Sequence, residues 1–164
     1  MNPGLLAIRK RASAVSPDTW RYWRIYVTAN NGDTYCVVGY TSGQYGFILA
    51  ATAGGATVLT SSMAYTSETA VYPGDTFASV CTSLLGTWLS NGQAGPWSAH
   101  VDLGTAMTLV ECRMYAENAS VGPARAPNTF QIQGSSDGVN WTVVKSFSGI
   151  NNWVAGQSLS FSLV

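Results

Sequence analysis

Charged side chains are scarce in this chain. Lys, Arg, Asp and Glu make up 10% of its 164 residues, against a usual share of about 25%. Amphipathic surface helices depend on such residues, so we expect few helices. Glycine, serine, threonine and aromatic residues are abundant instead, which favours a single all-β domain with a neutral polar surface.

Cysteines are few, and their number is odd. The chain has three, with no CxxC spacing, and this argues against a disulfide framework or a zinc site. Cys112 lies between Val110 and Met114 on one face of an expected strand. We therefore expect it to pack in the core as a small apolar residue.

Long apolar runs are missing as well. No stretch approaches the roughly 20 apolar residues of a membrane span. The first apolar run, residues 4–8, is shorter than a signal-peptide core of about 7–15 residues, and the basic cluster follows it. The doublet Leu84-Leu85 has no basic residues around it, so we expect no membrane insertion. Without a signal peptide or a membrane span, the chain is expected to fold in a cytoplasm.

The sequence shows no motif of residues suited to catalysis. His100 is the only histidine, and we expect it to face solvent or to satisfy a partner on a strand. Asp102, in an expected turn at residues 101–104, is expected to cap backbone amides. There is no evident carboxylate pair, phosphate-binding glycine motif or basic aromatic groove. The sequence therefore predicts no enzyme, no cofactor and no nucleic-acid binding.

The charge is unevenly distributed. Residues 1–24 hold five basic residues and one acid, a net charge of +4, and the other 140 residues hold three basic residues and seven acids, a net charge of −4. We interpret residues 1–18 as a basic N-terminal arm and residues 19–164 as the folded domain. The arm either docks on an acidic neighbour or is a disordered, solubilising tail.

A hairpin is readable at residues 126–141. Phe130 and Ile132 would face one side of a strand and the glutamines between and after them the other. Residues 134–138 supply a tight turn. Trp141 restarts an apolar strand, and we assign Trp141 to the core together with Trp97.

Other strands follow from the same reasoning. In residues 20–30, Trp23, Ile25 and Val27 alternate with polar residues. Residues 66–96 are expected to be mostly loop. About eight short strands broken by turns predict a jelly-roll β-sandwich. Besides residues 20–30 and the hairpin, the expected strands are residues 34–40, 47–51, 56–65, 97–103, 107–115 and 153–163.

Several motifs in order resemble the discoidin, or coagulation factor 5/8 type C, family of galactose-binding-like β-sandwiches. The resemblance covers roughly residues 22–164. The motifs are YWRIYVTANNG at residues 22–32, Gly54-Gly55, Tyr72-Pro73, Thr87-Trp88, Trp97 with VDLG at residues 101–104, Cys112-Arg113-Met114, APNTFQIQGSSDGVNW at residues 126–141, and Trp153.

The opening strand resembles versions of this domain in bacteriophage tail, baseplate or head-fibre proteins. The resemblance implies a virion structural protein, assembled in the bacterial cytoplasm, that helps attach the particle to host-surface carbohydrate. It would be oligomeric in the particle and would contact other virion subunits through the arm. The alternative is a purely architectural decoration or adaptor protein with no ligand of its own.

Ligand loops in this family cluster at one end of the sandwich. By resemblance they correspond here to residues 62–72, 84–96 and 116–127. Aromatic faces and polar groups in these loops suit a sugar ring, although core packing is the favoured interpretation of Trp88. The candidate ligand residues are Tyr65, Tyr72, Trp88, Asn91, Gln93, Asn118 and Arg125, and Tyr65, Asn91 and Arg125 are preferred.

The expected calcium position departs from the family pattern. Relatives commonly carry an aspartate where this chain has Ala78. A hard cation needs several oxygen ligands, so the loss of a carboxylate argues against bound calcium. If a site persists, Asp75 is the candidate ligand.

Overall fold

The computed structural model describes residues 18–39 and 43–164 and confirms an all-β sandwich. The described part contains ten strands and two short helices. The arm proposed for residues 1–18 lies outside it, apart from Asp18. No helix in this part of the chain is both long enough and apolar enough to cross a membrane.

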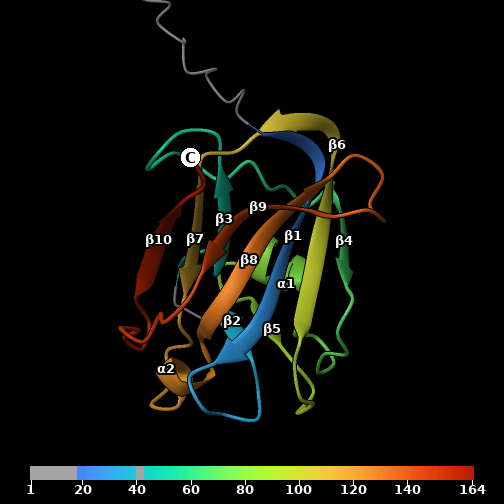
Figure 1. The fold of residues 1–164 in the computed structure, drawn as a ribbon. Helices are drawn as coiled ribbons and strands as arrows, with labels where there is room; N and C mark the ends of the chain where they lie inside the picture. Colours follow the sequence, from blue (N-terminus) through green and yellow to red (C-terminus); the bar gives the residue numbers. More distant parts are fainter. Residues whose placement is uncertain (1–17, 40–42) are drawn as a thin grey trace, which may run out of the picture.

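The larger layer is an antiparallel sheet of five strands, in the order β4-β6-β1-β8-β9 (Figure 1). Its central strand, β1, pairs with β6 on one side and with β8 on the other. The strands are β1 (Thr19–Asn30), β4 (Ala64–Ser67), β6 (Trp97–Thr108), β8 (Pro127–Ser135) and β9 (Thr142–Phe147).

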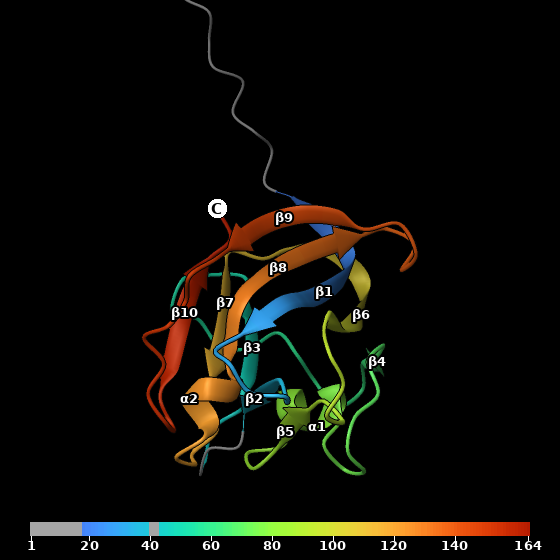
Figure 2. The same cartoon turned by 60° about the horizontal axis from the view of Figure 1, so that its bottom comes forward.

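The opposite layer is smaller and divided. A three-stranded sheet has the order β10-β7-β3, and β2 pairs separately with β5. Figure 2 shows α1, α2, β2 and β5 on the side of the molecule opposite β1, β8 and β9. The elements are β2 (Val37–Gly39), β3 (Phe47–Ala50), α1 (Phe77–Thr82), β5 (Thr87–Leu89), β7 (Glu111–Tyr115), α2 (Gly122–Arg125) and β10 (Ser158–Ser162).

The core lies between these layers, as the alternation in residues 20–30 predicted. Trp23, Ile25 and Val27 of β1 are buried, and their neighbours Phe130 and Ile132 of β8 are buried with them. Successive side chains of a strand point to opposite faces. The residues between them on β1 therefore lie on the outer side of the five-stranded sheet.

The three cysteines are buried and unbonded, so the expected packing role of Cys112 is confirmed. Burial raises the pKa of the thiols of Cys36, Cys81 and Cys112, which keeps them protonated. They act as small apolar side chains.

Two expectations about local structure are wrong, and a third is incomplete. The expected turn at residues 101–104 lies within β6, although Asp102 Oδ1 does accept a hydrogen bond from the Gly104 N–H at 2.7 Å. The expected strand at residues 56–65 forms only from Ala64 onward. Residues 66–96 are mostly loop, as expected, but this segment also contains α1 and β5.

Helix α1 has a local cause that the sequence interpretation missed. The Thr76 hydroxyl accepts a hydrogen bond from the Ser79 N–H at 3.2 Å and so caps the helix N-terminus. Phe77, Val80 and Cys81 then turn their side chains into the core. Ala78, at the position where the resemblance led us to look for a calcium ligand, is therefore a helical residue.

Trp141 is also misassigned by sequence. Trp97 packs in the core as predicted, but Trp141 is only half-buried and lies on the outer side of the five-stranded sheet, over Arg24 and His100. Its position follows from the β8–β9 turn, where Asp137 Oδ1 accepts hydrogen bonds from the N–H groups of Val139 and Asn140. This turn brings the ring back across the sheet.

Candidate functional site

A hollow of about 220 Å³ opens beside α2 and β5, which lie with β2 at one end of the sandwich (Figure 1). It is lined by Tyr35, Tyr72, Leu89 and Arg125. We call it the end hollow. Tyr72 and Arg125 are sequence-predicted ligand residues, so the structure brings two of the seven together.

The loop between β1 and β2 positions Tyr35. Asp33 Oδ1 accepts a hydrogen bond from the Tyr35 N–H at 2.9 Å, and Asn30 Nδ2 donates to the carbonyl oxygens of Asp33 and Tyr35 at 2.7 and 2.6 Å. Gly92 lies beneath the Tyr35 ring at φ +63°, where a Cβ would stand 3.1 Å from the ring. The ring position thus depends on a glycine 57 residues away in sequence.

Tyr72 faces Tyr35 across the hollow. Their hydroxyl oxygens are 3.3 Å apart, and their rings are 5.9 Å apart at an angle of 40°. Tyr72 is 37% exposed, and its N–H donates to the Leu89 carbonyl at 3.2 Å. The hydrogen bond with Tyr35 raises the pKa of Tyr72, so the Tyr72 phenol is neutral near pH 7 and can donate or accept.

Arg125, at the end of α2, is held from several sides. Its Nε lies 3.3 Å from Asp33 Oδ2, its Nη1 lies 3.2 Å from Glu117 Oε2, and its guanidinium carbon lies 5.2 Å from the centre of the Tyr35 ring. A planar guanidinium fixed in this way presents donors in a set direction. One positive charge between two carboxylates leaves a slight negative excess.

These groups suit an uncharged, hydroxyl-rich ring. The two tyrosines and Leu89 supply apolar and aromatic surface, and the phenols and Arg125 supply hydrogen-bonding groups. The carboxylates of Asp33 and Glu117 hold Arg125 in place. Carbohydrate recognition uses this combination of ring faces and fixed polar groups. A volume of 220 Å³ is below the ~300 Å³ at which drug-sized sites begin, so it fits one small ring.

Two of the predicted ligand residues lie elsewhere. Trp88 is 1% exposed and packs edge-on against Phe77 in the core, so its ring is not available at the surface. Tyr65, a preferred candidate, is half-buried in β4, where its ring also packs on Phe77 and its hydroxyl donates to the Thr60 carbonyl at 2.8 Å. Tyr65 therefore supports the core rather than the end hollow.

Three further candidates lie on loops but do not line the hollow. Asn91 is exposed between β5 and β6, and Asn118 is exposed between β7 and α2. Gln93 is half-buried, and its backbone carbonyl accepts a hydrogen bond from Trp97 Nε1 at 2.9 Å. A contact between these residues and a ligand stays a prediction.

The sequence interpretation missed Tyr35, Asp33 and Leu89. It treated residues 30–33 as a turn and Asp33 as a turn residue, although the combination of an acid and an aromatic residue directly after a turn was visible. The contact of this loop with α2 was not visible in the sequence, because it joins Asp33 to Arg125, 92 positions away.

The described residues contain no group of three or more His, Cys, Asp or Glu side chains that could hold a metal ion. Burial raises the pKa of Asp75. The Asp75 backbone instead links neighbouring segments, since its N–H donates to the Tyr72 carbonyl and its carbonyl accepts from the Leu89 N–H. The expectation that calcium is dispensable is left to experiment.

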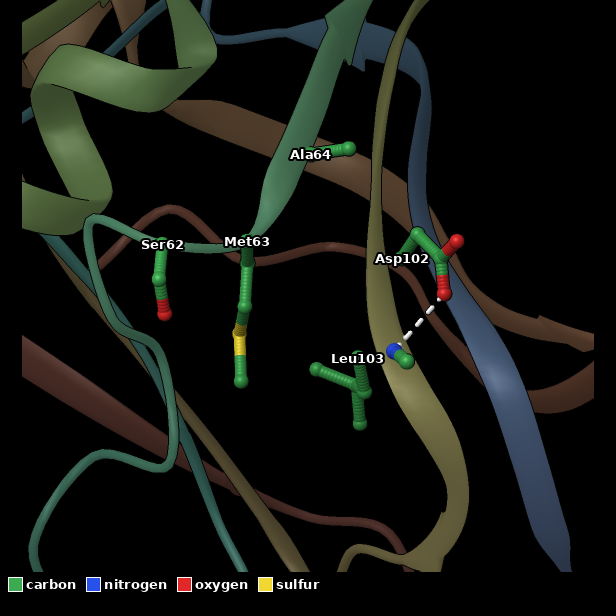
Figure 3. Close-up of a pocket in the computed structure, with 6 residues that line it drawn as sticks. Ser62, Met63, Ala64, Asp102 and Leu103 are labelled. Carbon is green, nitrogen blue, oxygen red and sulfur yellow. Dashed lines mark hydrogen bonds between the residues drawn. The ribbon is translucent and has the colours of Figure 1, made fainter.

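A second hollow, of about 310 Å³, lies beside the start of β4 (Figure 3). It is lined by Ser62, Met63, Ala64, Asp102, Leu103 and Gly104. Arg21 donates to both Asp102 carboxylate oxygens at 2.8 and 2.7 Å, and this hydrogen bonding lowers the pKa of Asp102 to about 2. No aromatic ring lines this hollow, so it suits a sugar less well.

The two antiparallel layers define an all-β sandwich of the galactose-binding-like type. Comparison with models of known families matches residues 75–163 to F5/8 type C, described as a NedA-like, galactose-binding domain. The match spans more than half of the chain, which therefore belongs to this family. It includes Leu89 and Arg125 but not Tyr35 or Tyr72. No curated protein and no solved structure matches the chain.

Proposed function

We propose that this domain binds a neutral sugar ring in the end hollow, without catalysing a reaction on it and without a metal cofactor. The observation that carries the proposal is the fixed arrangement of Tyr35, Tyr72 and Arg125 around a space of one small ring. The carboxylates of Asp33 and Glu117 beside Arg125 favour a neutral ligand over an acidic sugar, because the guanidinium charge is already compensated.

Titration calorimetry with galactose and other neutral monosaccharides tests this proposal. Tyr72→Phe removes one hydroxyl from the hollow, and Tyr65→Phe removes one that bonds Thr60 instead. We expect Tyr72→Phe to weaken binding several-fold, about 1 kcal/mol for one hydrogen bond, and Tyr65→Phe to leave the affinity unchanged. Equal affinities of both variants would place the sugar elsewhere, and no binding by the parent chain would refute the proposal.

We further propose that the domain belongs to a bacteriophage virion and helps attach the particle to host-surface carbohydrate. Support comes from the resemblance of residues 22–32 to phage structural proteins. In this proposal the basic residues 1–18 contact other subunits of an oligomeric assembly. Host adsorption by particles carrying Tyr72→Phe tests it, and an unchanged adsorption rate with intact particles would favour the architectural alternative.

A further inference from the structure

The outer side of the five-stranded sheet carries an ordered polar cluster. Arg24 of β1 lies at its centre, paired in register with His100 of β6 and Gln133 of β8. Its Nε and Nη2 donate to Gln133 Oε1 at 2.8 and 2.5 Å, and its Nη1 lies 3.3 Å from Glu68 Oε2. Glu68 Oε1 is in turn 2.8 Å from His100 Nδ1. We call these residues, with the rings beside them, the outer sheet face.

Aromatic rings lie over and beside this cluster. The Arg24 guanidinium carbon is 4.3 Å from the centre of the Trp141 ring, and the His100 ring is 5.3 Å from it. Tyr26 stands on the other side of Arg24, at 5.3 Å, and Tyr22 meets His100 edge-on at 6.5 Å. Three half-buried rings, Tyr22, Tyr26 and Trp141, therefore follow β1 along one face.

This face is ordered beyond what a solvent-covered sheet needs. The side chains of Arg24 and His100 are only 17% exposed, and Gln133 is 6% exposed. Their mutual hydrogen bonds and the stacked ring fix them before any ligand arrives. Such preorganisation lowers the entropy lost on binding.

The charges on this face are balanced. Arg24 pairs with Glu68, and Arg21 pairs with Asp102 at 2.7 Å. A balanced face offers no attraction to an anionic membrane or a nucleic acid. It matches an uncharged partner that stacks on rings and exchanges hydrogen bonds with amide, carboxylate and guanidinium groups.

We propose that the outer sheet face binds the internal units of a neutral polysaccharide chain, laid along β1 over Trp141, Tyr22 and Tyr26. The site is separate from the end hollow, which takes a single ring. The inference shares with the proposed function only the assumption that the ligand is carbohydrate. The rings of Tyr22 and Tyr26 lie four residues apart on β1, whereas the end hollow is one pocket of about 220 Å³, so we expect the two sites to differ in the length of sugar they recognise.

Affinity measurements with galactan, mannan and β-glucan, each beside its monosaccharide, test the inference. We expect Trp141→Ala to weaken binding of the best polysaccharide by about tenfold or more and to leave monosaccharide binding unchanged. Val139→Ala, in the same turn and 76% exposed, is the matched control and should leave both unchanged. Tyr26→Ala, outside the turn, should weaken polysaccharide binding as well, which separates loss of the site from disorder of the turn.

The outcomes separate the two sites. Loss of polysaccharide binding in Trp141→Ala and Tyr26→Ala, but not in Tyr72→Phe, supports the outer sheet face even if the end hollow binds nothing. Polysaccharide binding that survives both sheet variants and falls in Tyr72→Phe overturns the inference and leaves the proposed function standing. A change in sedimentation of Trp141→Ala with unchanged sugar binding would also overturn it, because the face would then contact a protein.

Discussion

The end hollow and the outer sheet face are built from similar groups in different ways. Each places an arginine next to a carboxylate and against an aromatic ring. The guanidinium carbon lies 5.2 Å from the ring centre in the hollow and 4.3 Å from it on the sheet. The hollow draws its residues from loops and from the ends of α2 and β5, whereas the sheet face draws most of its residues from paired strands. Strand register fixes spacing over several residues, and loops fix a single pocket. The strand arrangement of the sheet face suits a sugar chain, and the pocket of the end hollow suits one ring.

The two sides of β1 should respond very differently to the loss of a tryptophan. Trp23→Ala empties a buried site and should cost about 3–5 kcal/mol, a large part of a total stability of roughly 5–15 kcal/mol. Trp141→Ala removes a half-exposed ring over Arg24 and should cost about 1–2 kcal/mol. Urea unfolding of both variants checks this, and similar losses would mean that Trp141 belongs to the core after all.

The end hollow should be closed by a small change in the loop beneath it. Gly92→Ala adds a Cβ 3.1 Å from the Tyr35 ring at a positive φ, so Tyr35 must shift. We expect monosaccharide affinity to fall by about tenfold, with a stability loss of about 1 kcal/mol. Gly149→Ala is a control for backbone strain, because it has a similar φ of +69° and no neighbour within 4 Å. A fall in affinity in both variants would contradict a local effect on Tyr35.

Acid should weaken the outer sheet face through the protonation of Glu68. Burial by itself would raise the pKa of Glu68, but hydrogen bonds with His100 and Ser98 and the charge of Arg24 lower it from 4.5 to about 2. A lowered folded-state pKa means that Glu68 stabilises the fold above pH 4.5 and loses this contribution as the pH falls toward 2.

Melting temperatures of the parent chain and of Glu68→Gln between pH 2 and pH 6 measure this contribution. Glu68 is partly solvated, so we expect a difference of a few degrees at pH 6 that shrinks steadily below pH 4.5. A difference that is constant with pH would show that the ionised carboxylate is not the stabilising form.

Calcium removal should have the smallest effect of all. Ala78 is a helical residue, and Asp75 alone offers too few oxygen ligands for a hard cation. An ion stabilises the fold only in proportion to its concentration and affinity, so a chelator should leave the melting temperature unchanged. A clear drop would show that Asp75 and backbone carbonyls form a site.

Much of the larger sheet could be predicted from sequence, because burial alternates along its strands. Trp23, Ile25 and Val27, with Phe130 and Ile132 opposite, follow a period of two that only a half-buried strand explains. Trp141 breaks this logic. It precedes an edge strand, and the pairing of β8 with β9 shifts register between Ile132 and Gln133, so hydrophobicity alone did not reveal its side.

Only part of the end hollow could be predicted from the sequence. Resemblance located Tyr72 and Arg125, since they lie in loops that the family uses for ligands. Tyr35 and Asp33 reach the hollow through side-chain hydrogen bonds of Asn30 and through the space that Gly92 leaves. Such long-range loop contacts have no periodic signal. The misassignment of Tyr65 arose likewise, because its contact with Phe77 depends on the unpredicted helix α1.

The central claim is that this sandwich binds carbohydrate at the end hollow, and amide chemical-shift mapping during titration with galactose or the best neutral monosaccharide tests it most directly. The account predicts saturable shifts at Tyr35, Tyr72, Leu89 and Arg125, with no change at Trp141 until a polysaccharide replaces the single sugar. Shifts confined to residues away from the hollow, or no saturable shift with any neutral sugar, would contradict it.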